Sequence, residues 1–248
     1  MTIILPARNR HETICVTSAL HSNKSRLNIR PVPMESVNRR QLKTRSRAWP
    51  SAIARALARA RITPNQVSVA SIFFATIAGC AFCFAGESIG EPALWLGAAA
   101  AGIQLRLLCN LLDGLLAIEG GLKTKTGDLY NEIPDRIADI VILLCAGVAV
   151  HDYAWGLELA VAATILAVLT AYVRLVGGSL GLPQDFTGPM AKQHRMFALT
   201  VGALAGAIEH AVRGTVYALM AALAIIVVGC IITIMRRTWR IARALQTR

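Results

Sequence analysis

Two short polar segments interrupt the apolar stretches of this sequence and carry its most reactive arrangement of side chains. Asn110 and Asp113 are three residues apart, so on a helix they share one face. Asn131 and Asp135 are four residues apart and share a face in the same way. Carboxylate and amide oxygens are ligands of hard divalent cations. The spacing therefore predicts two neighbouring helices that face oxygen ligands toward each other and bind Mg²⁺ or Mn²⁺.

The elements that position these residues are apolar and long. Hydrophobic residues make up 55% of the 248-residue chain, and the mean hydropathy is +0.52, which is too apolar for an ordinary soluble domain. Apolar blocks of ~20 residues are typical of membrane spans. We expect an all-α, polytopic membrane helix bundle with about six transmembrane helices, at 66–86, 92–117, 132–151, 155–177, 197–211 and 214–235. Ionisable side chains at membrane depth are costly, so the polar face is a candidate functional site.

Positive charges indicate how the spans are oriented. The net charge is +12, and 13 of the 26 Lys and Arg residues precede Ile62, while five follow Met235. The turns at 87–91 and 152–154 contain no Lys or Arg, whereas 118–131 and 178–196 do. This distribution predicts that both termini and the polar site face the cytoplasm, in a bacterial inner membrane. Membrane lipids account for the basic flanks, and nucleic acid is not an expected partner.

The chain divides into four parts by composition. Residues 1–46 are basic and lack the apolar core of a signal peptide, and we expect them to form a disordered cytoplasmic arm. Residues 47–61 predict an interfacial amphipathic helix, because Trp49, Ile53 and Leu57 recur at helical spacing. Residues 62–236 would form the six-helix membrane catalytic domain, and 237–248 a basic cytoplasmic tail. The cysteines are interpreted as small packing residues.

The polar segments resemble a known family signature. Asn110-Leu-Leu-Asp113-Gly114-Leu-Leu-Ala117 and Gly127-x3-Asn131-x3-Asp135 match the spacing of the CDP-alcohol phosphatidyltransferases, Asp-x2-Asp-Gly-x2-Ala-Arg-x8-Gly-x3-Asp-x3-Asp. Asn110 and Asn131 replace the first and third aspartates of that signature, and Ile118 replaces its arginine. A Thr-Pro-Asn turn ending at Asn65, after the amphipathic segment, is also similar to the family.

The resemblance implies an integral membrane enzyme of phospholipid biosynthesis. Such an enzyme moves a phosphatidyl or related group from a CDP-linked lipid donor to an alcohol or polyol phosphate and releases CMP. It implies Mg²⁺ or Mn²⁺ on the diphosphate of the donor, with Asp135 also acting as the catalytic base. The implied metal ligands are Asn110, Asp113, Asn131 and Asp135, and the implied donor-binding residues are Asn65, Gly114, Ala117 and Gly127.

The two asparagines change the expected metal site. Asparagine offers a carbonyl oxygen but no charge, so two Asp-to-Asn replacements should weaken metal binding or reduce the number of ions. Asp128, Glu132 and Asp139 are candidate substitute ligands, and each has a structural alternative. Asp128 is also suited to a helix N-cap, and Glu132 to a solvated first-turn acid. Asp139 is also placed to pair with an arginine, either Arg106 or Arg136.

A second cluster is basic and follows the fourth expected span. Arg174, Lys192 and Arg195 would lie on the cytoplasmic side and suit a phosphate on the acceptor. Ordinary anchoring at the membrane surface explains Lys192 equally well, and snorkelling to the headgroups is the alternative for Arg174. Gly202-x3-Gly206 is compatible with close helix packing or with the seam of a homodimer.

Two functions of other classes remain as alternatives to the enzyme. One is a non-catalytic relative of the family that binds nucleotide-lipid or partner proteins in the membrane. The other is a small-molecule transporter, although the sequence lacks an evident inverted repeat of broken helices.

Overall fold

Seven α-helices account for nearly all of the residues that the structure describes. The computed structural model describes residues 48–119 and 126–247. Over these residues the chain is helical and contains no strand, which confirms the all-α prediction. The predicted arm at 1–46 lies outside the described residues. The helices are α2 (Ala48–Arg59), α3 (Pro64–Gly86), α4 (Pro92–Glu119), α5 (Gly127–Val148), α6 (Gly156–Ser179), α7 (Lys192–Arg213) and α8 (Tyr217–Gln246).

Four of the helices are long and apolar enough to cross a membrane, namely α3, α4, α6 and α8. This finding supports an integral membrane protein. The other two predicted spans correspond to α5 and α7, which do not meet that criterion. Both carry charged side chains along their length, including Asp135, Arg136 and Asp139 on α5, so hydropathy identifies four spans rather than six.

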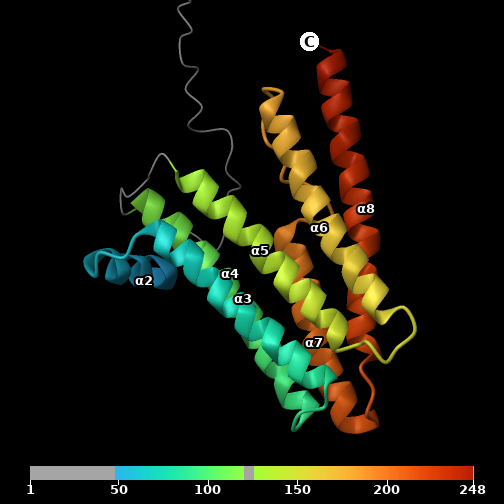
Figure 1. The fold of residues 1–248 in the computed structure, drawn as a ribbon. Coiled ribbons are helices and arrows are strands. Elements are labelled where there is room, and N and C mark those ends of the chain that lie inside the picture. Colours follow the sequence, from blue (N-terminus) through green and yellow to red (C-terminus); the bar gives the residue numbers. More distant parts are fainter. Residues whose placement is uncertain (1–47, 120–125, 248) are drawn as a thin grey trace, which may run out of the picture. The chain divides into compact units, whose positions relative to one another are not determined.

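Successive helices run in opposite directions. The α3–α4, α5–α6 and α7–α8 turns lie at one end of the bundle (Figure 1). The end of α4, the start of α5 and the end of α8 lie toward the opposite end, where α2 packs against α4 (Figure 1). The polar segments at Asn110–Asp113 and Asn131–Asp135 are therefore at the same end of the molecule.

Local sequence explains where α3 begins. Thr63 accepts a hydrogen bond from the Gln66 N–H at 3.3 Å, and the Gln66 side chain accepts one from the Thr63 N–H at 2.9 Å. This reciprocal capping box satisfies backbone donors that the helix leaves unpaired. Pro64 occupies the first helical position, where a missing N–H costs nothing. The expected restart of the helix at this turn is confirmed.

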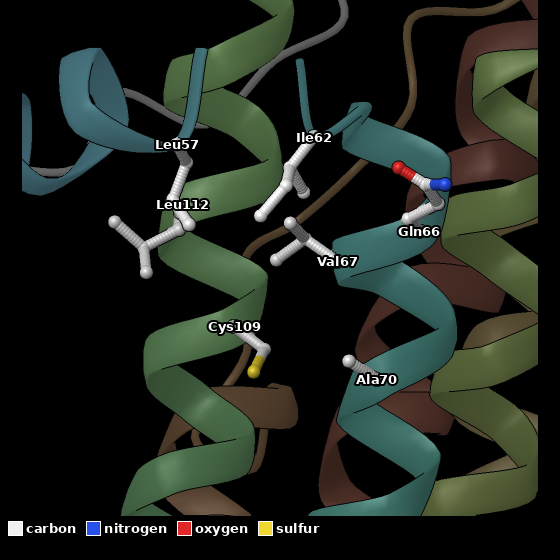
Figure 2. Close-up of a pocket in the computed structure, with 7 residues that line it drawn as sticks. All are labelled: Leu57, Ile62, Gln66, Val67, Ala70, Cys109 and Leu112. Carbon is white, nitrogen blue, oxygen red and sulfur yellow. The ribbon is translucent and has the colours of Figure 1, made fainter. Parts of the chain in front are cut away.

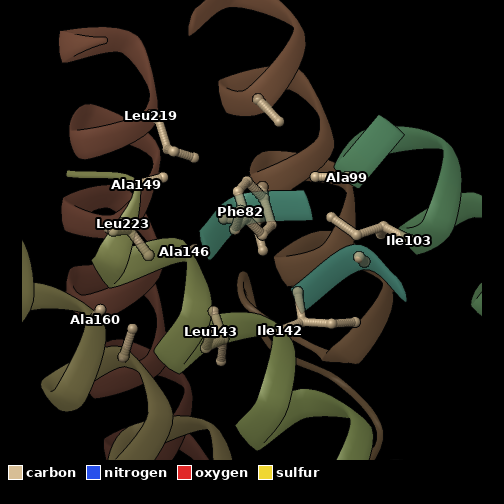
Figure 3. Close-up of a cluster of buried hydrophobic side chains, with 14 of the residues drawn as sticks. Phe82, Ala99, Ile103, Ile142, Leu143, Ala146, Ala149, Ala160, Leu219 and Leu223 are labelled. Carbon is tan, nitrogen blue, oxygen red and sulfur yellow. The ribbon is translucent and has the colours of Figure 1, made fainter. Parts of the chain in front are cut away.

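Small side chains let the helices approach closely in the core. Phe82 lies among Ala99, Ile103, Ile142 and Leu143 in the main buried cluster (Figure 3). A Cβ atom added to Gly202 on α7 would lie 2.4 Å from Cβ of Ala222 on α8. The Gly202-x3-Gly206 pattern therefore serves close packing between α7 and α8. The seam of a homodimer was the other interpretation of this pattern.

The last helix extends further than the expected final span. α8 continues to Gln246, so residues 237–246 of the predicted basic tail are helical. Arg237 in this extension is buried and donates hydrogen bonds to the backbone oxygens of Thr187 at 3.0 Å and Thr170 at 2.7 Å. The extension therefore anchors the segment that joins α6 to α7.

Candidate active site

Asp113 is buried on the inner face of α4 and is held by a residue of α3. The Ser68 hydroxyl donates a hydrogen bond to Asp113 Oδ2 at 2.6 Å. Asp113 also lies within electrostatic range of Asp135 and Lys192. The two aspartates that the sequence singles out thus lie within electrostatic range of each other on α4 and α5, two helices that both pack against α3.

Asp135 is buried on α5 and is surrounded by cations. The Lys192 ammonium at the start of α7 donates to Asp135 Oδ2. Arg106 Nη2 lies 3.5 Å from Asp135 Oδ1 and donates to the Asp135 backbone oxygen at 3.2 Å. Oδ1 itself is buried and has no hydrogen-bond partner. Both oxygens of Asp135 thus have a cationic neighbour, but only Oδ2 accepts a hydrogen bond from a side chain.

Asp139 lies one turn further into α5 and joins three helices. Its two oxygens accept hydrogen bonds from Arg106 of α4 at 2.6 Å and Arg195 of α7 at 2.7 Å. Arg106 is fully buried, and Asp139 and Arg195 are each about 1% exposed. Arg195 also donates to Thr170 Oγ1 at 3.1 Å and to the Met190 backbone oxygen at 3.2 Å. Arginine pairing, rather than metal ligation, therefore accounts for both oxygens of Asp139.

Glu132 and Arg174 form a separate pair closer to the helix ends. Arg174 Nη2 donates to Glu132 Oε2 at 2.6 Å, and its Nη1 donates to Gln184 Oε1 at 2.5 Å. The guanidinium carbon also lies 5.0 Å from the centre of the Phe186 ring. Glu132 is therefore ion-paired rather than solvated, and Arg174 does not snorkel freely toward headgroups.

The remaining expected site residues differ in burial. Asn110 is partly buried, and its Nδ2 atom has no hydrogen-bond partner, whereas Asn131 is exposed. Asn65, Gly114, Ala117 and Gly127 are partly exposed near the ends of α3, α4 and α5. Asp128 is exposed and lies inside the first turn of α5. The N-cap position is occupied by Thr126. The N-cap interpretation of Asp128 was wrong.

The donor set fits one hard divalent cation. Asp113 and Asp135 provide carboxylate oxygens, and a half-turn of the Asn110 amide would put an acceptor oxygen where its unpartnered nitrogen lies. Within residues 48–119 and 126–247, no group of three or more His, Cys, Asp or Glu side chains is arranged to hold a metal. The residues therefore fit an ion bound by two carboxylates and an amide better than a centre with more carboxylates.

An apolar cavity lies beside the polar site. It has a volume of about 510 Å³ and lies between α2, α3 and α4 (Figure 2). Cys109 and Leu112, which neighbour Asn110 and Asp113 on α4, line it, and Cys109 lies between α4 and α3 (Figure 2). The lining residues are Leu57, Ile62, Gln66, Val67, Ala70, Cys109 and Leu112. An alkyl chain would fit this space.

The segment between α6 and α7 is fixed by polar contacts. Asp185 Oδ1 accepts from the Thr187 N–H at 2.8 Å, and its Oδ2 accepts from Arg240 at 3.1 Å. Partial burial acts to raise the pKa of Asp185, but the hydrogen bonds from Thr187 and Arg240 outweigh it and hold the pKa below its ordinary value. Asp185 thus stays ionised and keeps the segment bound to α8.

Sequence reasoning missed several partners of the site. Ser68, Thr170 and Gln184 all hydrogen-bond to site residues but belong to no recognised motif. Ser68 had one signal, because it is a small polar residue on the buried face of an otherwise apolar helix. Thr170 and Gln184 depend on how α6 packs against α7 and α5.

Comparisons with known proteins identify the family of the chain. The family model described as CDP-alcohol phosphatidyltransferase matches residues 61–235. The inner membrane protein YnbA of Escherichia coli is 26% identical over 147 residues, which are 59% of this chain and 69% of that protein. Phosphatidylinositol phosphate synthase of Mycobacteroides abscessus is 27% identical over 191 residues, 75% of this chain and 80% of that protein.

Solved structures share the fold. The crystal structure of Mycobacterium tuberculosis phosphatidylinositol phosphate synthase in complex with manganese and citrate has a TM-score of 0.64 and 20% identity, and the match covers 77% of this chain and 88% of that chain. The same enzyme with CDP-DAG bound gives a TM-score of 0.62 and 21% identity, covering 77% and 92%. With the family model matching well over half of its length, the chain belongs to the CDP-alcohol phosphatidyltransferase family and is a membrane transferase.

Proposed function

We propose that the protein transfers a phosphatidyl or related group from a CDP-linked lipid donor to an alcohol that carries a phosphate, with release of CMP. The observation that carries this proposal is that buried Asp113 of α4 and buried Asp135 of α5 lie within electrostatic range of each other, beside an apolar cavity and a set of cations. A relative of similar fold binds manganese and CDP-DAG, which supports the choice of donor and of Mg²⁺ or Mn²⁺.

Asp113, Asp135 and Asn110 would hold the metal, and Asn131 would approach it from the exposed first turns of α5. Ser68 orients the carboxylate of Asp113 through its 2.6 Å hydrogen bond. A bound divalent cation would neutralise charge on the diphosphate as CMP leaves. The chain's own residues then have to place the acceptor and remove its proton.

In the proposed step, the acceptor hydroxyl oxygen forms a bond to the phosphorus that bears the lipid. The bond from that phosphorus to the bridging diphosphate oxygen breaks, and its electron pair leaves with CMP. The hydroxyl proton passes to Asp135, whose Oδ1 has no donor to compete with it. Atoms and charge balance without a further reactant.

The apolar cavity would take part of an acyl chain of the donor. It adjoins α4 on the side of Asp113 and is bounded by α2. The nucleotide would then lie over Asn65, Gly114, Ala117 and Gly127, which are partly exposed. In this arrangement the headgroup of the lipid donor would face water at the helix ends.

The cations expected to bind an acceptor phosphate differ in how far a soluble molecule can reach them. The Arg195 side chain is about 1% exposed and that of Arg174 about 7%, while that of Lys192 is about 24% exposed. We assign Arg195 to holding Asp139 and Arg174 to the acceptor phosphate, since Arg174 lies nearer the helix ends and its partner Glu132 is partly exposed.

The orientation follows from the charges at the helix ends. Six membrane helices, α3 to α8, with α2 at the interface, put the site and the basic extension of α8 on the cytoplasmic side. In this arrangement α5 and α7 cross the bilayer inside the bundle, with their charges turned toward each other.

The test is CMP release by the purified protein, given CDP-diacylglycerol, a panel of polyols and polyol phosphates, and Mg²⁺ or Mn²⁺. We expect metal-dependent CMP release that is lost in Asp113→Ala and Asp135→Ala. Asp152→Ala is the matched control, because Asp152 is an exposed aspartate in the turn between α5 and α6. If the wild type releases CMP only at a metal-independent background rate, and both site variants release it at that same rate, the result would instead favour a non-catalytic binding protein.

A further inference from the structure

Lys192 is held in place by the backbone that precedes it. The Met190 N–H donates to Thr233 Oγ1 of α8 at 3.0 Å, and the Met190 oxygen accepts from Arg195 at 3.2 Å. Gly188 has a φ of +138°, and a Cβ there would lie 2.5 Å from a methyl carbon of Thr233. Only glycine tolerates this combination readily. The segment from Gly188 to Lys192 is therefore seated on α8, and the Lys192 ammonium arrives at Asp135 from a fixed position.

The ammonium contacts one oxygen of Asp135 and not the other. Lys192 donates to Oδ2, whereas Oδ1 is buried, accepts no hydrogen bond and has Arg106 Nη2 at 3.5 Å as its ion-pair partner. A buried carboxylate oxygen that accepts no hydrogen bond is costly, so it is expected where a ligand or a proton transfer uses it. Lys192 thus determines which oxygen of Asp135 is available.

The excess of positive charge around the site disfavours the binding of several metal ions. The family signature has aspartates where this chain has Asn110 and Asn131, so two negative charges are missing. Asp113, Glu132, Asp135 and Asp139 face cationic side chains on α4, α5, α6 and α7. Those cations are Arg106, Arg136, Arg174, Lys192 and Arg195. Each added divalent cation would increase a positive excess that the protein already has.

We propose that the Lys192 ammonium acts as a resident cation of the site. It holds Asp135 Oδ2, leaves Oδ1 as the oxygen that takes the acceptor's proton, and restricts the chain to the one divalent cation that Asp113, Asp135 and Asn110 would hold. Lys192 is then a positioning residue for Asp135 and not a ligand of the acceptor phosphate. The part concerning Oδ1 rests on the proposed function, whereas the number of metal ions does not.

The test measures Mn²⁺ bound to the purified full chain by electron paramagnetic resonance of the free ion, together with CMP release. Wild type should bind one Mn²⁺ per chain. Lys192→Met keeps an unbranched side chain that is one atom shorter and removes the charge, so this variant should bind a second Mn²⁺ or bind the first at least about tenfold more tightly. Lys192→Arg keeps a cation and should retain one ion.

Two further variants make the result specific. The double variant Lys192→Met/Asp135→Asn also removes the Asp135 carboxylate, which Lys192→Met alone leaves without its ammonium partner. The gain in Mn²⁺ binding should therefore disappear in the double variant. Arg236→Met removes one exposed positive charge elsewhere on α8 and should bind Mn²⁺ like the wild type. Size-exclusion profiles and thermal unfolding report whether each variant is folded.

Several outcomes would overturn the proposal. These are two ions in the wild type, unchanged Mn²⁺ binding in Lys192→Met, and a gain that persists in the double variant. If Lys192 is only a structural ion pair, Lys192→Met lowers the melting temperature without changing the Mn²⁺ count. Absence of CMP release from the wild type would refute the proposed reaction but leave the Mn²⁺ titration to decide the role of Lys192.

Discussion

At the scale of single residues, carboxylates spaced along one helix have different roles because their partners differ. Asp135 and Asp139 are four residues apart on α5, yet Asp139 is fully engaged by two arginines while Asp135 keeps one oxygen without a donor. Glu132, three residues before Asp135, pairs with Arg174 instead. Burial and partners, rather than residue type, separate a candidate base from a structural acid.

Ser68 provides a prediction at this scale. Removing its hydroxyl in Ser68→Ala takes away the 2.6 Å hydrogen bond that orients Asp113. We expect CMP release to fall by roughly 10- to 100-fold, the range for partners of metal-ligating groups. Steady-state rates at several Mn²⁺ concentrations check this, because misorientation of Asp113 should also raise the Mn²⁺ concentration needed.

Ser71→Ala is the matched control for that change. Ser71 is equally buried on α3, but its hydroxyl donates to the Ser68 backbone oxygen at 2.6 Å. Its loss should leave CMP release within about twofold of the wild type, since a helical serine of this kind adds little. Equal losses in both variants would mean that α3 packing, and not the contact with Asp113, is responsible.

At the scale of elements, the buried ion triad decides how the helices meet. Arg106 of α4, Asp139 of α5 and Arg195 of α7 join three helices around one carboxylate. Arg195 reaches α6 as well, through Thr170. The angle at which α5 lies between its neighbours is therefore tied to charges as well as to apolar packing.

Asp139→Asn tests this connection. It removes the charge that two buried arginines share, and uncompensated buried charge typically costs about 3–5 kcal/mol. We expect a lower free energy of unfolding in detergent, measured by thermal or denaturant melts. Asp185→Asn is the control because Asp185 pairs with the half-exposed Arg240. Such a pair contributes about 0–1 kcal/mol, and a comparable loss in both variants would contradict the triad's role.

The contact between α7 and α8 gives a second test at this scale. Gly202→Ala would place a Cβ 2.4 Å from Ala222, so the helices must separate, at a cost of about 1–3 kcal/mol. Gly97→Ala on α4 is its control, because a Cβ there has no atom within 4 Å. The melting temperature of Gly97→Ala should equal or exceed that of the wild type, since alanine favours helices.

Features that depend on neighbouring residues could be predicted from the sequence, whereas contacts between residues far apart in the chain could not. The helices and the Thr63 turn follow from local periodicity and sequence, and the structure bears them out. The shared site of Asp113 and Asp135 follows from motif spacing and stays a prediction. The contact of Lys192 with Asp135 joins residues 57 apart. No local pattern specifies such a contact, because it depends on how α6, α7 and their connecting segment pack. Ser68 was missed for the same reason.

At the scale of the whole molecule, the alternating directions of the helices bring both motif segments toward one end. The motif ends of α4 and α5 and the basic end of α8 point away from the end that has the short turns (Figure 1). A membrane enzyme that meets a lipid donor and a soluble acceptor needs this separation of a reactive end from a closed end.

Accessibility of single cysteines tests the orientation. In a variant without its native cysteines, Ser88→Cys in the α3–α4 turn should react with a membrane-impermeant maleimide added to intact cells. Ser179→Cys at the end of α6 should react only after the membrane is opened. Both serines are exposed, so burial does not limit the reaction. The opposite labelling pattern would invert the proposed topology.

The buried position of Arg106 has a consequence for biogenesis. A guanidinium at the middle of α4 and a carboxylate within α5 would each be expensive alone in lipid, and α5 is too polar to rank among the apolar spans. Paired, the two charges neutralise each other. We therefore expect α4 and α5 to enter the bilayer as one helical hairpin, because the ion pair of the finished site also lowers the cost of inserting α5.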